Sequence, residues 1–200
     1  DDVTIRNTRV TGDGWILISI TPGVTGTTIE HVELDGRGAA GAPGSTGIIG
    51  SATVVAADVH SLENGIIPGS GSVIRDSWVH DLEASGGDPH YDGIQLDGGQ
   101  SNVLIERNTV DITNQDQTSA VMINNDFGPV DGVVVRANHL SGGSFTVYTD
   151  AKFAGGPITG VTFVDNVLVS GGYGYQLVRE ALVGWTGNID GGDGAILRGP

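Results

Sequence analysis

The clearest copy of a recurring pattern is Val103-Leu104-Ile105-Glu106-Arg107-Asn108-Thr109-Val110, in which apolar residues flank a short polar stretch. Similar copies occur along the whole chain, and each is followed by a turn rich in Gly, Ser or Asp. They begin at Val3, Thr27, Val54, Val73, Val133 and Val161, and Trp185 to Ile189 is a worn final copy. Such regular recurrence is typical of a repeat protein.

The copies lie too far apart for a helical period. Taking Ile5, Ile29, Val54, Ile74, Ile105, Val135 and Phe163 as equivalent, the steps are 24, 25, 20, 31, 30 and 28 residues. A second short apolar stretch, such as Gly93-Ile94-Gln95-Leu96, lies between successive copies. This arrangement predicts an all-β fold, a right-handed parallel β-helix built as a single-stranded solenoid of about eight rungs.

The alternative fold is an antiparallel β-sandwich, which favours hairpin turns between neighbouring strands. The pairs Arg107-Asn108 and Asp165-Asn166 instead recur at one place in the repeat. Amide side chains that recur in this way favour a stack at a tight corner, and therefore the solenoid.

The composition limits the partners. The chain has 200 residues, 34 of them Gly and none Cys, with a net charge of -15. It suits one domain over residues 1–200, and this domain can be a piece of a longer chain. The acidic balance argues against nucleic acid, which needs a basic face. No apolar run is long enough to span a membrane. An anionic polymer would need local cations, either Arg, Lys or a divalent metal.

The connecting segments are expected to mark the binding side. Loops inserted at a fixed point of each rung emerge on the same face, and that face commonly carries the function. The expected loops are residues 36–45, 83–89, 113–118, 150–159 and 170–174.

Polar side chains are densest over Asp88-Pro89-His90-Tyr91-Asp92-Gly93, just before an expected strand. An imidazole titrates near neutral pH and is made more basic by a neighbouring carboxylate. We therefore predict His90 as a base that Asp88 and Asp92 orient, with Tyr91 as acid or base. Gly93 is expected to permit a sharp turn. The alternative is a corner histidine that only caps backbone groups.

This region carries a family resemblance. Asp88 to Gln95 and Ile105-Glu106-Arg107-Asn108-Thr109 resemble secreted bacterial β-helix repeat proteins of the pectate-lyase-like superfamily. Asp88-Pro89-His90 is also similar to the signature of the alginate C5-epimerases, although Tyr91 follows here in place of an acid. The resemblance implies the parallel β-helix, a secreted or cell-surface bacterial protein and a polysaccharide partner. The superfamily includes lyases, epimerases, hydrolases and non-catalytic proteins, so one activity does not follow.

Two further sets of residues are candidates for chemistry. His60, His80 and Asp111 each lie six residues after an equivalent position, so they are expected on adjacent rungs. They form either a solvated polar ladder or a His-His-Asp metal site, and His80 is also a catalytic candidate. Lys152 and Arg179 lie 27 residues apart, about one turn. Some similar β-helix lyases use such a pair as base and carboxylate partner; the alternative is two solvated cations.

Oxygen-bearing side chains form another group, which would suit Ca²⁺. Its predicted ligands are Asp97, Asn124 and Asp126, with Asp150 and Glu180 close by in later rungs. The residues predicted to contact a sugar chain are Gln95, Asn125, Tyr148, Tyr173 and Tyr175. The tyrosines would stack on sugar faces, or else they are ordinary strand aromatics.

Three functions are compatible with these residues. The first is a lyase or C5-epimerase that abstracts the C5 proton of a uronate-containing polysaccharide, which needs a base, an acid and a neutralised carboxylate. The second is a non-catalytic, glycan-binding or adhesive β-helix. The third is a glycoside hydrolase, with paired carboxylates drawn from Asp88, Asp92 and Asp97.

Overall fold

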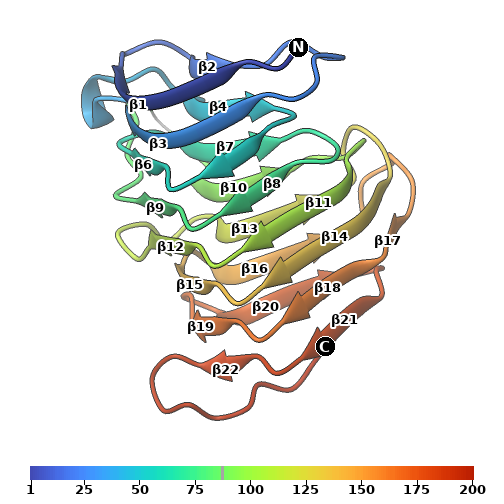
Figure 1. Cartoon of the computed structure of the whole chain (residues 1–200). Helices are drawn as coiled ribbons and strands as arrows, with labels where there is room; N and C mark the ends of the chain where they lie inside the picture. Colours follow the sequence, from blue (N-terminus) through green and yellow to red (C-terminus); the bar gives the residue numbers. More distant parts are fainter. Residues whose placement is uncertain (87) are drawn as a thin grey trace.

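The computed structural model describes residues 1–86 and 88–200, and its strands form a right-handed parallel coil (Figure 1). The predicted β-helix is therefore confirmed. The described residues contain one short 3-10 turn, η1 (Gly38–Ala40), and no α-helix. None of their helical segments is long and apolar enough to cross a membrane.

The coil has three faces, which are named here for their place in Figure 1. The front face holds β5 (Thr53–Val55), β8 (Val73–Arg75), β11 (Ser101–Glu106), β14 (Val130–Arg136), β17 (Ile158–Thr159), β18 (Val161–Val164) and β21 (Val183–Thr186). The side face holds the short strands β6 (Asp58–His60), β9 (Trp78–His80), β12 (Thr109–Ile112), β15 (His139–Gly142), β19 (Val167–Val169) and β22 (Ile189–Asp190). At the N-terminal end, β1 (Thr4–Thr11) and β3 (Thr28–Asp35) extend over the front face and the side face.

The third face is a separate seven-stranded sheet, the back sheet. Its strands are β2 (Ile16–Ser19), β4 (Thr46–Gly50), β7 (Asn64–Pro68), β10 (Asp92–Leu96), β13 (Ser119–Asn124), β16 (Phe145–Asp150) and β20 (Gly174–Arg179). Each strand pairs in parallel with the equivalent strand of the next rung.

The register confirms the repeat that the sequence predicts. Ile5, Ile29, Val54, Ile74, Ile105, Val135 and Phe163 are paired in that order across the front face. Trp185 pairs with Phe163, so the worn final copy is also a rung. The spacing of the copies in the sequence matches the pairing in the structure, because parallel in-register stacking places equivalent apolar residues directly above one another.

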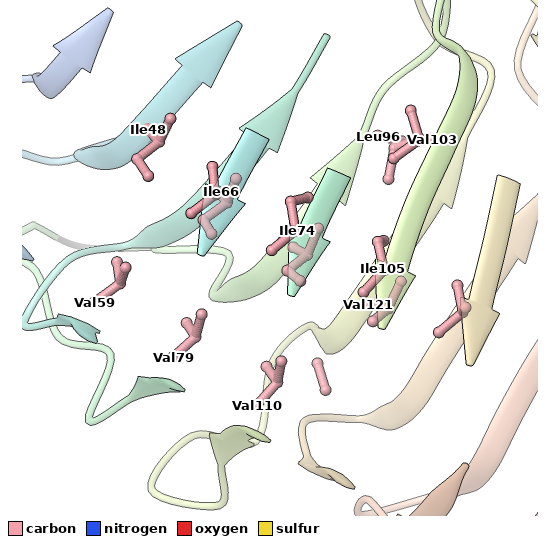
Figure 2. Close-up of a cluster of buried hydrophobic side chains, with 14 of the residues drawn as sticks. Ile48, Val59, Ile66, Ile74, Val79, Leu96, Val103, Ile105, Val110 and Val121 are labelled. Atoms are coloured by element: carbon pink, nitrogen blue, oxygen red, sulfur yellow. The ribbon is translucent and has the colours of Figure 1, made fainter. Parts of the chain in front are cut away.

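The core consists of three apolar columns, one from each face, that meet inside the coil (Figure 2). Ile74 and Ile105 come from the front face, Val79 and Val110 from the side face, and the column of Ile48, Ile66 and Val121 from the back sheet; all are at most 1% exposed. Fully burying such a side chain contributes about 1.5–3 kcal/mol. Because no rung buries its column alone, stability depends on stacking.

The corner between front and side faces explains the recurring Asn. A residue with positive φ, such as Arg107 (52°) or Ala137 (54°), turns the chain, and a buried residue follows it. Asn108, Asn138, Asn166 and Asn188 stack there, and the amide Nδ2 of each of the first three donates to Oδ1 of the next at 2.8–3.0 Å. The predicted stack of amides is confirmed.

The loops do not all emerge on one side, and this expectation is corrected. Most of the loops connect the side face to the back sheet: residues 36–45, 81–91, 113–118 and 170–173. Gly87 lies outside the described residues. Residues 151–157 instead connect the back sheet to the front face. Sequence spacing shows where a rung is lengthened but not at which of its three corners.

Candidate functional site

The outer surface of the back sheet gathers more predicted residues than any other part of the described chain. Gln95, Met122, Tyr148 and Leu177 are successive partners in one half-buried row. The neighbouring row continues through Asn124, Asp150 and Arg179, and Asp97 joins it by accepting a hydrogen bond from Asn124 Nδ2 at 2.8 Å. We call these two rows the back-sheet site.

Two cations lie at one end of the back-sheet site. Arg179 forms an ion pair with the buried carboxylate of Asp150, while 42% of the arginine side chain remains exposed. The backbone N–H of Lys152 donates to Asp150 Oδ1 at 3.2 Å, so the main chain of this exposed lysine starts next to the pair. A guanidinium carries five donors in a planar fork, so Arg179 retains N–H groups for a further carboxylate.

Aromatic side chains lie nearer the start of β16 and β20. The ring of Phe145 packs edge-on against Tyr148 at 5.6 Å and contacts Tyr173 at 5.9 Å, and Tyr173 is 79% exposed. Burial raises the pKa of the Tyr148 phenol, so this group keeps its proton at neutral pH. The site therefore combines a protonated phenol with an exposed aromatic surface.

The predicted calcium ligands satisfy one another. Asp97 Oδ1 accepts hydrogen bonds from Gln95 Nε2 at 3.0 Å and from Asn124 Nδ2 at 2.8 Å. Asn124 Oδ1 in turn accepts the backbone N–H of Asp126 at 2.9 Å. Burial raises the pKa of Asp97, an effect that a bound cation would oppose. Within the described ranges no three His, Cys, Asp or Glu residues are placed to hold a metal. Asp97 and Asn124 thus bond each other, and the calcium site stays a prediction.

The Asp88-Pro89-His90 motif lies in the loop between β9 and β10, at the corner beside the back sheet. Asp88 and His90 are exposed. The backbone N–H of His90 donates to Glu63 Oε1 at 3.2 Å, and Glu63 Oε2 accepts the N–H of Gly44 at 2.6 Å. A cavity of about 130 Å³ lined by Glu63, Asp88 and Pro89 lies here. It is smaller than ordinary ligand pockets, which run to about 300–1,000 Å³.

Tyr91 and Asp92 lie beneath this loop. Tyr91 is 7% exposed, and its hydroxyl accepts the backbone N–H of Ala84 at 3.3 Å, which ties the loop to the core. Asp92 is 2% exposed and its Oδ1 accepts a hydrogen bond from Ser119 Oγ at 3.2 Å. Burial raises the pKa of Asp92 to about 8. In the described structure no hydrogen bond joins Asp92 or Asp88 to the His90 imidazole.

His80 lies on the side face and not on the back sheet. Its Nε2 is 2.8 Å from Asp58 Oδ1 and its Nδ1 is 2.7 Å from Asp81 Oδ2. The imidazole also stacks on Trp78, with 3.5 Å between ring centroids. A corner separates β9 from β10, so the structure does not bring His80 together with Arg179.

The predicted His60, His80 and Asp111 ladder is present, because these residues are successive Cα partners on the side face. The two imidazoles are 5.2 Å apart between centroids. Each engages its own carboxylates, His60 with Glu33 and His80 with Asp58. The residues therefore form a polar ladder and do not converge on one metal position.

Two predicted sugar contacts have other partners. Asn125 is 1% exposed, and its amide bonds the backbone of Ala151 and Phe153, which holds the loop after β16. Tyr175 packs against the core, and its hydroxyl donates to Asp190 Oδ2 at 2.7 Å. Asn124, next to Asn125 in sequence, faces the back-sheet site, because a one-residue shift along a strand moves a side chain to the other face. Tyr173 precedes the strand that holds Tyr175, and it is exposed.

Three side chains that the sequence did not indicate take part in the arrangement. Phe145 supports Tyr148, Ser119 bonds Asp92, and Glu63 anchors two loops. Phe145 begins the same strand as Tyr148, which is the one sequence signal that points to it. Glu63 and Ser119 reach the site only through pairing with the neighbouring rungs.

No family model matches the chain, and no curated protein matches it. Among solved structures, the A-module of the mannuronan C-5 epimerase AlgE4 from Azotobacter vinelandii is similar over 94% of this chain and 71% of that chain. The identity is 11% and the TM-score is 0.37. A likeness at this level carries no argument about activity.

Proposed function

We propose that this β-helix binds a uronate-containing polysaccharide across the back-sheet site and acts on it by abstracting the C5 proton. One observation supports this most. In a chain of net charge -15, Arg179 lies near Tyr148 on the outer surface of the back sheet, and the backbone of Lys152, in the loop that follows, bonds Asp150, the partner of Arg179. Cations placed on an acidic protein next to aromatic rings suit an acidic sugar.

The chemistry follows from the roles of these groups. The sugar carboxylate pairs with Arg179, and also with Lys152 where His90 is the base, which stabilises the negative charge that develops when C5 loses its proton. Lys152 or His90, both exposed, is the base. In a lyase the C5–H electrons form the C4–C5 double bond, the C4–O4 bond breaks, and the phenol of Tyr148 protonates the leaving oxygen. In an epimerase the C4–O4 bond stays intact and the phenol of Tyr148 gives a proton to C5 from the opposite face.

Removing the Tyr148 hydroxyl is the direct test of this assignment. The Tyr148→Phe variant is expected to lower kcat/KM at least about a hundredfold, because a general acid contributes that much or more. Turnover is measured on alginate, pectate and glycosaminoglycans, by ultraviolet absorbance of the unsaturated product and by incorporation of solvent deuterium at C5. His139→Gln, on the exposed side face, is the matched control and should retain full activity. Unchanged turnover by Tyr148→Phe would exclude this role.

The second candidate is a non-catalytic glycan-binding β-helix. It is favoured by the separation of the predicted acid and base residues, since His80 lies on the side face and Tyr91 lies in the core. The hydrolase alternative has less support, because Asp92 is buried and Asp97 is bonded to amides.

Lys152→Gln separates binding from catalysis. Lys152 is exposed, so its loss should not disturb folding. A charge-assisted contact contributes roughly 1.5–3 kcal/mol, so affinity for an acidic polysaccharide should fall about tenfold or more. Affinity is measured by calorimetry with defined oligouronates. Binding that depends on Lys152, without product or deuterium exchange, would identify the binding protein; unchanged affinity would place the site elsewhere.

A further inference from the structure

A buried polar row crosses the back sheet where its strands begin. Thr46, Asn64, Asp92 and Ser119 are successive partners in the ladder, and each is at most 9% exposed. Adjacent strands are about 4.8 Å apart, so these side chains are direct neighbours. Apart from the amide stack at the corner, the other buried columns of the coil are largely apolar.

Two facts about this row call for a hydrogen-bond donor. Asn64 Oδ1 is a buried acceptor with no hydrogen-bond partner in the described structure. Asp92, its register neighbour, is a buried carboxyl for which the described residues show no ion pair. A buried acceptor left unpaired costs roughly 1–3 kcal/mol, and a buried unpaired charge costs more. A single proton on Asp92 satisfies both groups.

The charged groups around Asp92 favour that proton. Glu63 directly precedes Asn64, the partner of Asp92 in β7, and Asp97 directly follows the strand of Asp92. Besides burial, both carboxylates raise the pKa of Asp92, because they disfavour another negative charge nearby. The hydroxyl of Ser119 from β13 donates to Asp92 and by itself lowers the pKa of this carboxyl, but burial outweighs it. The phenol of Tyr148, on β16, adds no charge, because burial raises its pKa and it stays protonated.

We propose that Asp92 is a neutral carboxylic acid in the folded protein at neutral pH and donates its proton to Asn64 Oδ1, forming a pH-sensitive latch. The latch lies where two loops are fastened, because Glu63, next to Asn64, accepts the N–H groups of Gly44 and His90. Ionisation of Asp92 puts a third carboxylate beside Glu63 and Asp97 and leaves Asn64 without a donor. The proposal does not depend on the carbohydrate function.

The sign of the pH dependence follows from linkage. The ordinary pKa of this carboxyl is 3.8 and its folded pKa is about 8. The folded state therefore binds the proton more tightly, so the group's contribution to stability is complete below about pH 4 and is lost as the pH rises to about 8. Within that window the folding equilibrium constant falls up to about tenfold per pH unit from this group alone.

The test compares the intact protein with its Asp92→Asn variant in urea unfolding from pH 5 to pH 9. Asparagine has the same shape and supplies an N–H in place of the acid proton. The variant should be the more stable at pH 7, and its advantage should grow several-hundredfold or more between pH 5 and pH 8, then level off. Asp88→Asn, an exposed change in the neighbouring loop, is the control and should follow the wild type.

A second measurement does not depend on how the variant folds. The carbon-13 resonance of the Asp92 carboxyl, identified by its absence from the Asp92→Asn spectrum, should titrate near pH 8 in the wild type. A midpoint near pH 4, or an Asp92→Asn variant whose stability difference from wild type does not change with pH, would overturn the proposal. Either result would mean that Asp92 is ionised and that another group neutralises it.

Discussion

Replacing Asn138 by alanine is expected to lower the free energy of unfolding by about 4 kcal/mol. The Asn138 side chain makes four hydrogen bonds inside the corner between front and side faces. It accepts from the backbone N–H and the side-chain amide of Asn108, and it donates to Ile105 O and Asn166 Oδ1. Alanine removes all four and leaves buried groups without partners, where water has little access.

Urea denaturation of Asn138→Ala at neutral pH measures the effect. Thr109→Ala is the matched control, because Thr109 is an exposed strand residue one rung away and next to the same amide stack. It should change stability by less than about 0.5 kcal/mol. A loss below about 1 kcal/mol for Asn138→Ala would show that the stacked amides contribute little and that the apolar columns alone hold the corner.

The second large effect is expected at Gly93, in the polar motif. From the sequence this glycine is expected to permit a sharp turn, but its φ is not in the left-handed region. Its role is close approach instead. A Cβ at this position would lie 2.2 Å from Val110 Cγ1 and 2.6 Å from the carbonyl oxygen of Ala120. The backbone of the next rung occupies the space that a side chain would need.

Gly93→Ala is therefore expected to destabilise the protein by at least about 3 kcal/mol, since the clash includes backbone that cannot move without breaking the ladder. Thermal and urea unfolding measure it. Gly14→Ala is the control, because a Cβ there meets nothing within 4 Å and its φ is ordinary. That change should be neutral or stabilising by up to about 1 kcal/mol. Equal stability of the two variants would contradict the close-approach explanation.

Much of the candidate site follows from the sequence once the repeat is aligned. The alignment that pairs Ile74 with Ile105 also places Asp97 beside Asn124 and Asp150 beside Arg179. It cannot show whether a side chain points into the core or out of it where a strand meets a corner. For this reason Tyr91 and Asp92, adjacent in the motif, are a core anchor and a buried acid, while His90 is exposed.

The sequence by itself determined the coil, its rung boundaries and its amide corner, because in-register parallel stacking requires equivalent residues to recur along the chain. Only the tertiary structure decided which face each polar residue occupies. His80 and His90 are ten residues apart in sequence, yet a corner separates their surroundings. Burial raises the pKa of Asp92, and the carboxylates of Asp97 and Glu63, the latter one rung away, raise it further. Burial and charge at a site depend on neighbours in space, and these come from the stacked rungs.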